Sequence, residues 1–145
     1  YDYESYFSEF AANHPDSCGC KLAFMPDLAR RVYAGADIFL MPSRSEPCGL
    51  AQMIALRYGT VPVVRETGGL RDTIHDCGYG EGNGFTFASY SAVDMIHALV
   101  RAKNLYYDHP DEWDMLRRAG MRCDNSWKNA AGQYVALYKQ MLTLW

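Results

Sequence analysis

The sequence of 145 residues lacks a long hydrophobic run and lacks an excess of positive charge. Its apolar runs are only a few residues long, as at 38–42, whereas a helix needs about 20 apolar residues to cross a bilayer. Fourteen Lys and Arg against seventeen Asp and Glu leave a net charge of −3, which is the wrong sign for binding phosphate backbones. We therefore expect neither a membrane nor a nucleic acid as a partner.

Cysteines are present without the pattern of a disulfide framework or a metal site. The five cysteines are an odd number in a chain large enough to need no disulfides, which favours a reducing compartment. Cys18 and Cys20 lack a second Cys or His pair at the spacing of a zinc site, and no His adjoins Cys48 to activate its thiol. We expect a cytoplasmic protein without a metal, in which Cys48 is by itself a small apolar residue.

The start of the chain lacks the features of a secretory signal. It opens on the residues YDYE, without an initiator Met, a basic segment or an apolar segment. The composition is 49% hydrophobic, which is enough for a buried core and argues against disorder. We expect one folded domain that is a piece of a longer protein.

The hydrophobic pattern predicts alternating strands and helices. Short apolar or β-branched runs predict strands at 20–24, 38–41, 61–65 and 85–87. Helical spacing and capping residues predict helices at 3–13, from Pro26, at 49–58, at 70–75, after Ser91, from Pro110 to Gly120, and at about 126–144. Four glycines in residues 76–84 predict a surface loop. This alternation is typical of the α/β class, with a parallel, doubly wound, Rossmann-like sheet covered by helices.

The most informative candidate site follows the strand predicted at 38–41. In an open parallel sheet the ligand crevice lies outside the carboxyl ends of the strands. Glu46 stands there, just before a helix whose first turn holds Gly49, Leu50 and Ala51. Free backbone N–H groups and the helix dipole favour a phosphate at that point, so the carboxylate must face another part of the ligand, and a nucleotide-sugar fits. The alternative is that Glu46 only suits the helix dipole and Gly49 only relieves a tight turn.

Two further candidates stand after other predicted strands. Gly68 and Gly69 permit a positive φ or close approach of a ligand, although Gly-Gly turns are common without any ligand. Phe24 is placed to stack on a flat base, or is a core residue.

Three segments of the chain resemble the bacterial glycogen synthases and plant starch synthases that use ADP-glucose. They are ADIFLMPSRSEPCGLAQ at 36–52, RYGTVPVVR at 57–65 and TGGLRDT at 67–73, and the resemblance continues at 83–87 and 125–127. It implies a GT-B arrangement of two Rossmann-like domains. It also implies transfer of glucose from ADP-glucose to the non-reducing end of an α-1,4-glucan with retention, with no cofactor and no metal.

The resemblance also assigns roles to single residues. Glu46 matches a glutamate beside the transferred glucose, where it supports an oxocarbenium-like transition state. Phe24 falls where the family places an aromatic ring over the adenine. The remaining matches are to residues whose backbone lines the sugar, Cys48 and Gly49, and to residues whose N–H groups meet the diphosphate, Gly49, Leu50 and Ala51.

Two departures from the pattern limit what this chain does by itself. Ile54 stands where the wider class of retaining GT-B transferases often has a second acid, and the family's Arg and Lys at the diphosphate would precede Tyr1. The resemblance implies that residues 1–145 are part of the C-terminal nucleotide-sugar domain, that the acceptor domain lies outside the chain, and that the chain alone is inactive. The alternatives are a transferase that uses a UDP-sugar and a non-catalytic nucleotide- or glucan-binding module.

The final predicted helix has an apolar stripe that includes Trp127, Tyr134 and Tyr138. The resemblance implies that the end of the chain crosses back to the other domain. Exposed apolar patches tend to be covered by partners, so we expect the isolated chain to self-associate through this helix or through a vacated sheet edge.

Overall fold

The computed structural model describes residues 2–79 and 81–143. The chain divides into two units, and the boundary in the sequence falls between Arg30 and Arg31. The first unit holds α1 (Asp2–Asn13) and the start of α2 (Pro26–Gly35), which confirms both predicted helices. The strand predicted at 20–24 was wrong, because the structure has no strand at those residues. A short apolar run does not form a strand unless another strand satisfies its backbone hydrogen bonds.

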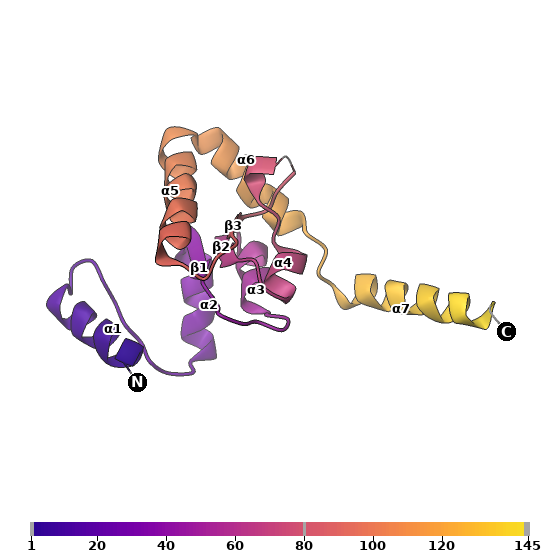
Figure 1. Ribbon diagram of the computed structural model, residues 1–145, viewed down its shortest axis with the longest axis horizontal. Coiled ribbons are helices and arrows are strands. Elements are labelled where there is room, and N and C mark those ends of the chain that lie inside the picture. The colour runs from indigo at the N-terminus through magenta and orange to yellow at the C-terminus, as the bar shows by residue number, and fades with distance from the viewer. Residues whose placement is uncertain (1, 80, 144–145) are drawn as a thin grey trace. The chain divides into compact units, whose positions relative to one another are not determined.

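The second unit contains a parallel sheet of three strands (Figure 1). They are β1 (Ile38–Met41), β2 (Val61–Arg65) and β3 (Phe85–Phe87), in the order β1-β2-β3. Ile38 lies opposite Val61, and Val63 lies opposite Phe85. All three strands have the predicted bounds, since apolar and β-branched residues suit a sheet that is covered on both faces.

Helices of the second unit precede, connect or follow these strands. Ser91 and Ser126 cap two of them by accepting hydrogen bonds from the backbone N–H groups of Val93 and Asn129, as the sequence predicts. The elements are α3 (Ala51–Tyr58), α4 (Gly69–Thr73), a 3₁₀ turn (Cys77–Tyr79), α5 (Ala92–Asp108), α6 (Pro110–Arg122) and α7 (Trp127–Leu142). Helices α3 to α6 cover the strands.

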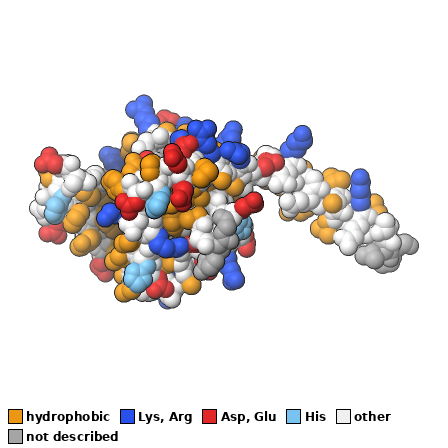
Figure 2. Space-filling model, turned by 90° about the horizontal axis from the view of Figure 1, so that it is seen from above, with side chains coloured by type: hydrophobic (Ala, Val, Ile, Leu, Met, Phe, Trp, Pro, Cys, Tyr) orange, Lys and Arg blue, Asp and Glu red, His pale blue; other side chains and the backbone are white. Residues whose placement is uncertain are grey.

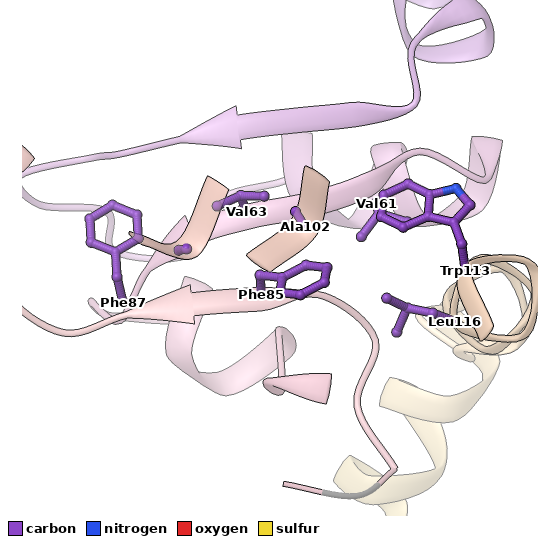
Figure 3. Packing of buried hydrophobic residues seen from close by; sticks show 8 residues of the cluster. Val61, Val63, Phe85, Phe87, Ala102, Trp113 and Leu116 are labelled. Carbon is purple, nitrogen blue, oxygen red and sulfur yellow. The ribbon is translucent and has the colours of Figure 1, made fainter. Parts of the chain in front are cut away.

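The two faces of the sheet are buried under different helices. On one face the side chains of β2 and β3 contact α5 and α6 (Figure 3), through the cluster Val61, Val63, Phe85, Phe87, Ala98, Ala102, Trp113 and Leu116. On the other face Val64 contacts Leu56 of α3, Leu70 of α4 and Ile74. Alternate residues of β2 thus point to opposite layers. This arrangement confirms the predicted doubly wound α/β fold.

Some helix bounds differ from the prediction for local reasons. Helix α3 begins at Ala51 and not at Gly49, because Gly49 has a φ of +75°, and α4 spans 69–73 and not 70–75. Gly120 does not end α6, which continues to Arg122. It is buried, and a Cβ there would lie 2.7 Å from Leu56 Cδ2. Gly120 therefore allows α6 to pack closely against α3.

Helix α7 contributes nothing to the core. None of its described residues is buried, and Trp127 is 87% exposed. Figure 2 shows hydrophobic side chains on the surface of this helix. Tyr134 and Tyr138 are exposed. Crossing back to another domain and self-association of the chain stay predictions. In the part of the chain that the structure describes, no helix is long and apolar enough to span a membrane.

The loop predicted at the surface over 76–84 has buried ends, and Asp76 is the reason at one of them. The Asp76 carboxylate receives two hydrogen bonds from Arg101, at 2.8 and 2.7 Å. It also accepts from the backbone N–H groups of Thr86 in β3 (2.8 Å) and Gly78 (2.9 Å). Burial raises the pKa of Asp76, but these donors outweigh burial and hold the pKa at about 2 instead of 3.8. Asp76 thereby provides a hydrogen-bond acceptor for the backbone N–H of Thr86 on the edge strand β3.

Replacing Asp76 by Asn keeps its shape but removes the anion that faces Arg101. We expect the free energy of unfolding to fall by about 2 kcal/mol. Because the folded pKa lies below the unfolded value, this stabilisation is present above about pH 4 and is lost as the pH falls toward 2. Urea unfolding at several pH values measures it, and the difference between wild type and Asp76→Asn shrinks in that range.

The control is Asp114→Asn, which removes a carboxylate that binds Arg117 and Arg118 on the surface of α6. Exposed ion pairs contribute less than about 1 kcal/mol. An equal loss for the two variants would contradict the role given to Asp76.

Candidate functional site

The loops that follow β1 and β2 lie in direct backbone contact. The N–H of Gly69 at the start of α4 donates to the carbonyl oxygens of Glu46 (3.3 Å) and Pro47 (3.2 Å). This contact lies beyond the carboxyl ends of two neighbouring parallel strands, which is where a ligand crevice forms in such sheets. The structure therefore brings Glu46 together with Gly68 and Gly69, as the sequence predicts.

Both glycines are required by this contact. Gly68 has a φ of +45°, and a Cβ there would lie 2.0 Å from the Glu46 carbonyl oxygen. A Cβ at Gly69 would lie 2.0 Å from the carbonyl oxygen of Cys48. The sequence left open whether Gly68-Gly69 serves a ligand or a common turn. In the structure the two glycines let one loop lie on the other.

Gln52 is a residue of this site that the sequence did not single out. Its side chain is fully buried, and its Nε2 faces the Gly49 carbonyl (2.9 Å), the Cys48 carbonyl (3.2 Å) and Thr73 Oγ1 (3.1 Å). Thr73 Oγ1 in turn donates to the Gly69 carbonyl at 2.6 Å. We call this set of hydrogen bonds the Gln52–Thr73 link. It joins the backbone after β1 to the backbone after β2.

Arg65 holds the first part of the loop after β1. It is the last residue of β2, and its Nη1 donates to the carbonyl oxygens of Ser43 (3.1 Å) and Arg44 (2.8 Å). Its guanidinium also lies over the ring of Tyr90, 5.6 Å from the centroid. The sequence showed only a positive charge at this position, because both acceptors are backbone atoms more than twenty residues away.

The N-terminus of α3 opens beside Glu46. The N-cap Leu50 makes no side-chain hydrogen bond to the first turn, and helix geometry gives the first N–H groups no partner within the helix. Glu46 and Gly49 are half-buried, while Leu50 and Cys48 are exposed. The positive end of the helix dipole thus lies in a partly exposed segment a few residues after Glu46, and it can hold an anion while Glu46 faces a less negative part of the same ligand.

Gly49 is a glycine for two structural reasons. Its φ is +75°, and a Cβ would lie 2.6 Å from Gln52 Oε1. The interpretation of Gly49 as a tight-turn residue is therefore correct, and it is compatible with an open N-terminus of α3. Contact between Gly49 and a ligand stays a prediction.

Phe24 belongs to the first unit, where its ring is 96% exposed. Its predicted stacking on adenine stays a prediction. Within residues 2–79 and 81–143, no three His, Cys, Asp or Glu side chains converge in a way that could hold a metal ion.

A cavity of about 720 Å³ runs along the outer face of α3. Leu50, at the N-terminus of that helix, lines one end of the cavity. Ile54 also lines it, at the position where the wider class of retaining GT-B transferases often has a second acid. The other lining residues are Met53, Arg57 and residues 121–126 of α6 and the connection to α7. This wall of α3 is therefore mainly apolar.

Comparison with known proteins identifies the family of the chain. Residues 18–114 match the family described as "Glycosyl transferases group 1", which is more than half of the chain. The chain belongs to this glycosyltransferase family. The matched segment contains β1, β2 and β3 and the whole contact between the two loops.

Curated relatives and solved structures agree with this family. Glycogen synthase of Clostridium novyi (strain NT) is 49% identical over 145 residues, covering 99% of this chain and 30% of that protein. Glycogen synthase of Moorella thermoacetica is 50% identical over 142 residues, covering 97% of this chain and 29% of that protein. The chain thus spans only about 30% of the length of these relatives.

A solved glycosyltransferase structure superimposes on nearly the whole chain. It is the catalytic domain of starch synthase IV from Arabidopsis thaliana bound to ADP and acarbose, with a TM-score of 0.86 and 36% identity over 98% of this chain and 29% of that chain. Sucrose-phosphate synthase from Thermosynechococcus elongatus has the same fold, with a TM-score of 0.69 at 23% identity over 99% of this chain and 34% of that chain.

Substituting Ala at Gly69 tests the contact between the two loops. The added Cβ would lie 2.0 Å from the Cys48 carbonyl, so the loops must separate, and we expect a loss of about 1–3 kcal/mol in the free energy of unfolding. Gly132→Ala in α7 is the control, since a Cβ there has nothing within 4 Å and Ala favours a helix. Thermal unfolding compares them, and a Gly69→Ala protein as stable as wild type would show that the contact is dispensable.

Proposed function

We propose that the protein containing this chain is a glycogen synthase, which transfers glucose from ADP-glucose to the non-reducing end of an α-1,4-glucan with retention of configuration. The observation that carries the proposal is the placement of Glu46 beside the uncapped N-terminus of α3, where the loops after β1 and β2 meet. Family membership and relatives named glycogen synthase support it. The ADP in the starch synthase IV structure supports ADP-glucose as the donor.

In this proposal the two ends of the donor meet different parts of the site. The diphosphate binds the N–H groups of Gly49, Leu50 and Ala51, where the helix dipole stabilises negative charge. Glu46 faces the glucose, whose anomeric carbon becomes positive as the bond to the diphosphate breaks. The backbone at Cys48 and Gly49 lines the sugar.

The proposed transfer exchanges one bond at the anomeric carbon for another. The C1–O bond to ADP breaks and its electron pair leaves with the diphosphate, while C1 bonds to the acceptor hydroxyl oxygen. The hydroxyl proton passes to the leaving phosphate. In this proposal no cofactor or metal takes part. The ring of Phe24 stacks on the adenine of the donor.

The proposal places the acceptor on a part of the protein outside this chain. The chain spans about 30% of its relatives' length, which leaves room for a second domain that binds the glucan. It also places the protein in the cytoplasm, which the five free cysteines support. We propose that residues 1–145 alone do not transfer glucose.

Replacing Glu46 by Ala in the full-length protein tests its role in the reaction. A group that acts mainly in the transition state affects kcat more than substrate binding, so we expect kcat to fall by at least about 100-fold with a smaller change in KM for ADP-glucose. Steady-state kinetics with a glucan acceptor measures both values. Glu112→Ala on the surface of α6 is the control, and near-normal turnover of Glu46→Ala would remove Glu46 from the mechanism.

A donor competition test separates the proposed donor from its alternative. Labelled ADP-glucose is given to the full-length protein with increasing unlabelled ADP-glucose or UDP-glucose, and label in the glucan is counted. We expect UDP-glucose to compete poorly. Equal or better competition by UDP-glucose identifies a UDP-sugar transferase, as does transfer from labelled UDP-glucose alone. Absence of transfer from both labelled donors favours a non-catalytic binding module.

A further inference from the structure

We propose that Thr73 and Gln52 are positioning residues that fix the loop bearing Glu46 without touching the substrate. This inference rests on the proposed glucosyl transfer, and it concerns how Glu46 is held and not what Glu46 does. Neither residue was a candidate from the sequence. The structure assigns them through the Gln52–Thr73 link.

The link and the glycine contact together fix the loop from two sides. On one side the N–H of Gly69 holds the carbonyl groups of Glu46 and Pro47. The carbonyl of the same Gly69 accepts from Thr73 Oγ1, which accepts from Gln52 Nε2. On the other side Gln52 Nε2 donates to the backbone immediately after Pro47.

The orientation of the Gln52 amide is set by its acceptors. Two of its three neighbours are backbone carbonyl groups, which only accept, so Nε2 and not Oε1 must face them. Oε1 is buried and has no hydrogen-bond partner among the described residues. A buried acceptor left unpaired costs free energy, and this orientation is retained because the two N–H bonds of the amino group are shared among the three acceptors on Cys48, Gly49 and Thr73.

Small displacements of a catalytic group have large effects on rate. Glu46 belongs to a loop and not to a regular element, so its position depends on these backbone contacts. A displacement of about 1 Å can cost about 100-fold in rate. Two of the N–H groups that the proposal assigns to the diphosphate, those of Leu50 and Ala51, stand at the N-cap and the first residue of α3, so loosening the loop at Glu46 should affect turnover more than donor binding.

The test compares four substitutions in the full-length protein. Thr73→Val removes the hydroxyl and keeps the shape, while Thr73→Ser keeps the hydroxyl. Thr60→Val is the control, since Thr60 is buried where Thr73 is half-buried, and its Oγ1 likewise donates to backbone carbonyls, those of Tyr33 and Ala36, at the opposite end of β2. Both Val variants lose hydroxyl hydrogen bonds, so a purely structural role predicts the same pattern for both.

We expect Thr73→Val to lower kcat about tenfold with a change in KM for ADP-glucose below about threefold. Thr73→Ser should restore kcat to within about twofold of wild type. Thr60→Val should lower the thermal unfolding midpoint and leave kcat near wild type. Gln52→Met, which removes the amide donors at similar length, should lower kcat at least as much as Thr73→Val.

Each remaining outcome overturns a specific statement. If wild type transfers glucose and Thr73→Val and Gln52→Met both keep its kcat, the positioning role is overturned and the proposed function stands. The same holds if Thr60→Val lowers kcat as much as Thr73→Val. If wild type transfers no glucose while its fold is intact, the proposed function fails and the positioning role fails with it.

Discussion

The close approach of two backbones at Gly69 is the constraint on which the site depends. A parallel sheet places the ends of neighbouring strands side by side, but it does not fix the irregular loops that follow them. Here the N–H of Gly69 reaches the carbonyls of Glu46 and Pro47, and no side chain on Gly68 or Gly69 could be accommodated. The distance between the two loops is thereby set by backbone atoms, which vary less in position than long side chains.

The edge strand β3 makes hydrogen bonds both to β2 and to a side chain outside the sheet. β3 hydrogen-bonds to β2 along one edge, and Asp76 accepts from Thr86 on that strand. Arg101, reaching from α5, keeps this carboxylate charged and oriented. An unpaired edge invites other strands, and the ion pair between the buried Asp76 and the partly exposed Arg101 holds the carboxylate against this edge strand.

Much of the fold could be predicted from the sequence because its signals are local. The strands at 38–41, 61–65 and 85–87 are dense in apolar and β-branched residues, and Ser91 and Ser126 mark helix starts by their own hydrogen bonds. The run at 20–24 has the same local signal but does not form a strand in the structure. Local composition does not report whether a pairing partner exists.

The parts of the site that could not be predicted depend on distant contacts. Glu46 and the glycines stand out because charge and missing side chains are visible in a sequence, and the motif that contains them is long. Gln52 and Thr73 are 21 residues apart, and Arg65 acts on backbone carbonyls that have no sequence signal. Polar residues of this kind are indistinguishable from ordinary surface residues until the chain is folded.

The N-terminus of α3 lacks a stabilising cap and thereby keeps its N–H groups available for a ligand. A helix without an N-cap side chain forgoes about 1 kcal/mol, and Leu50 supplies no such cap. A capping side chain would occupy the N–H groups that an anion needs. Gln52, the second residue of α3, instead anchors the preceding backbone at Cys48 and Gly49 through their carbonyl groups. The loop is thus held by its acceptors while the donors that a ligand would use stay free.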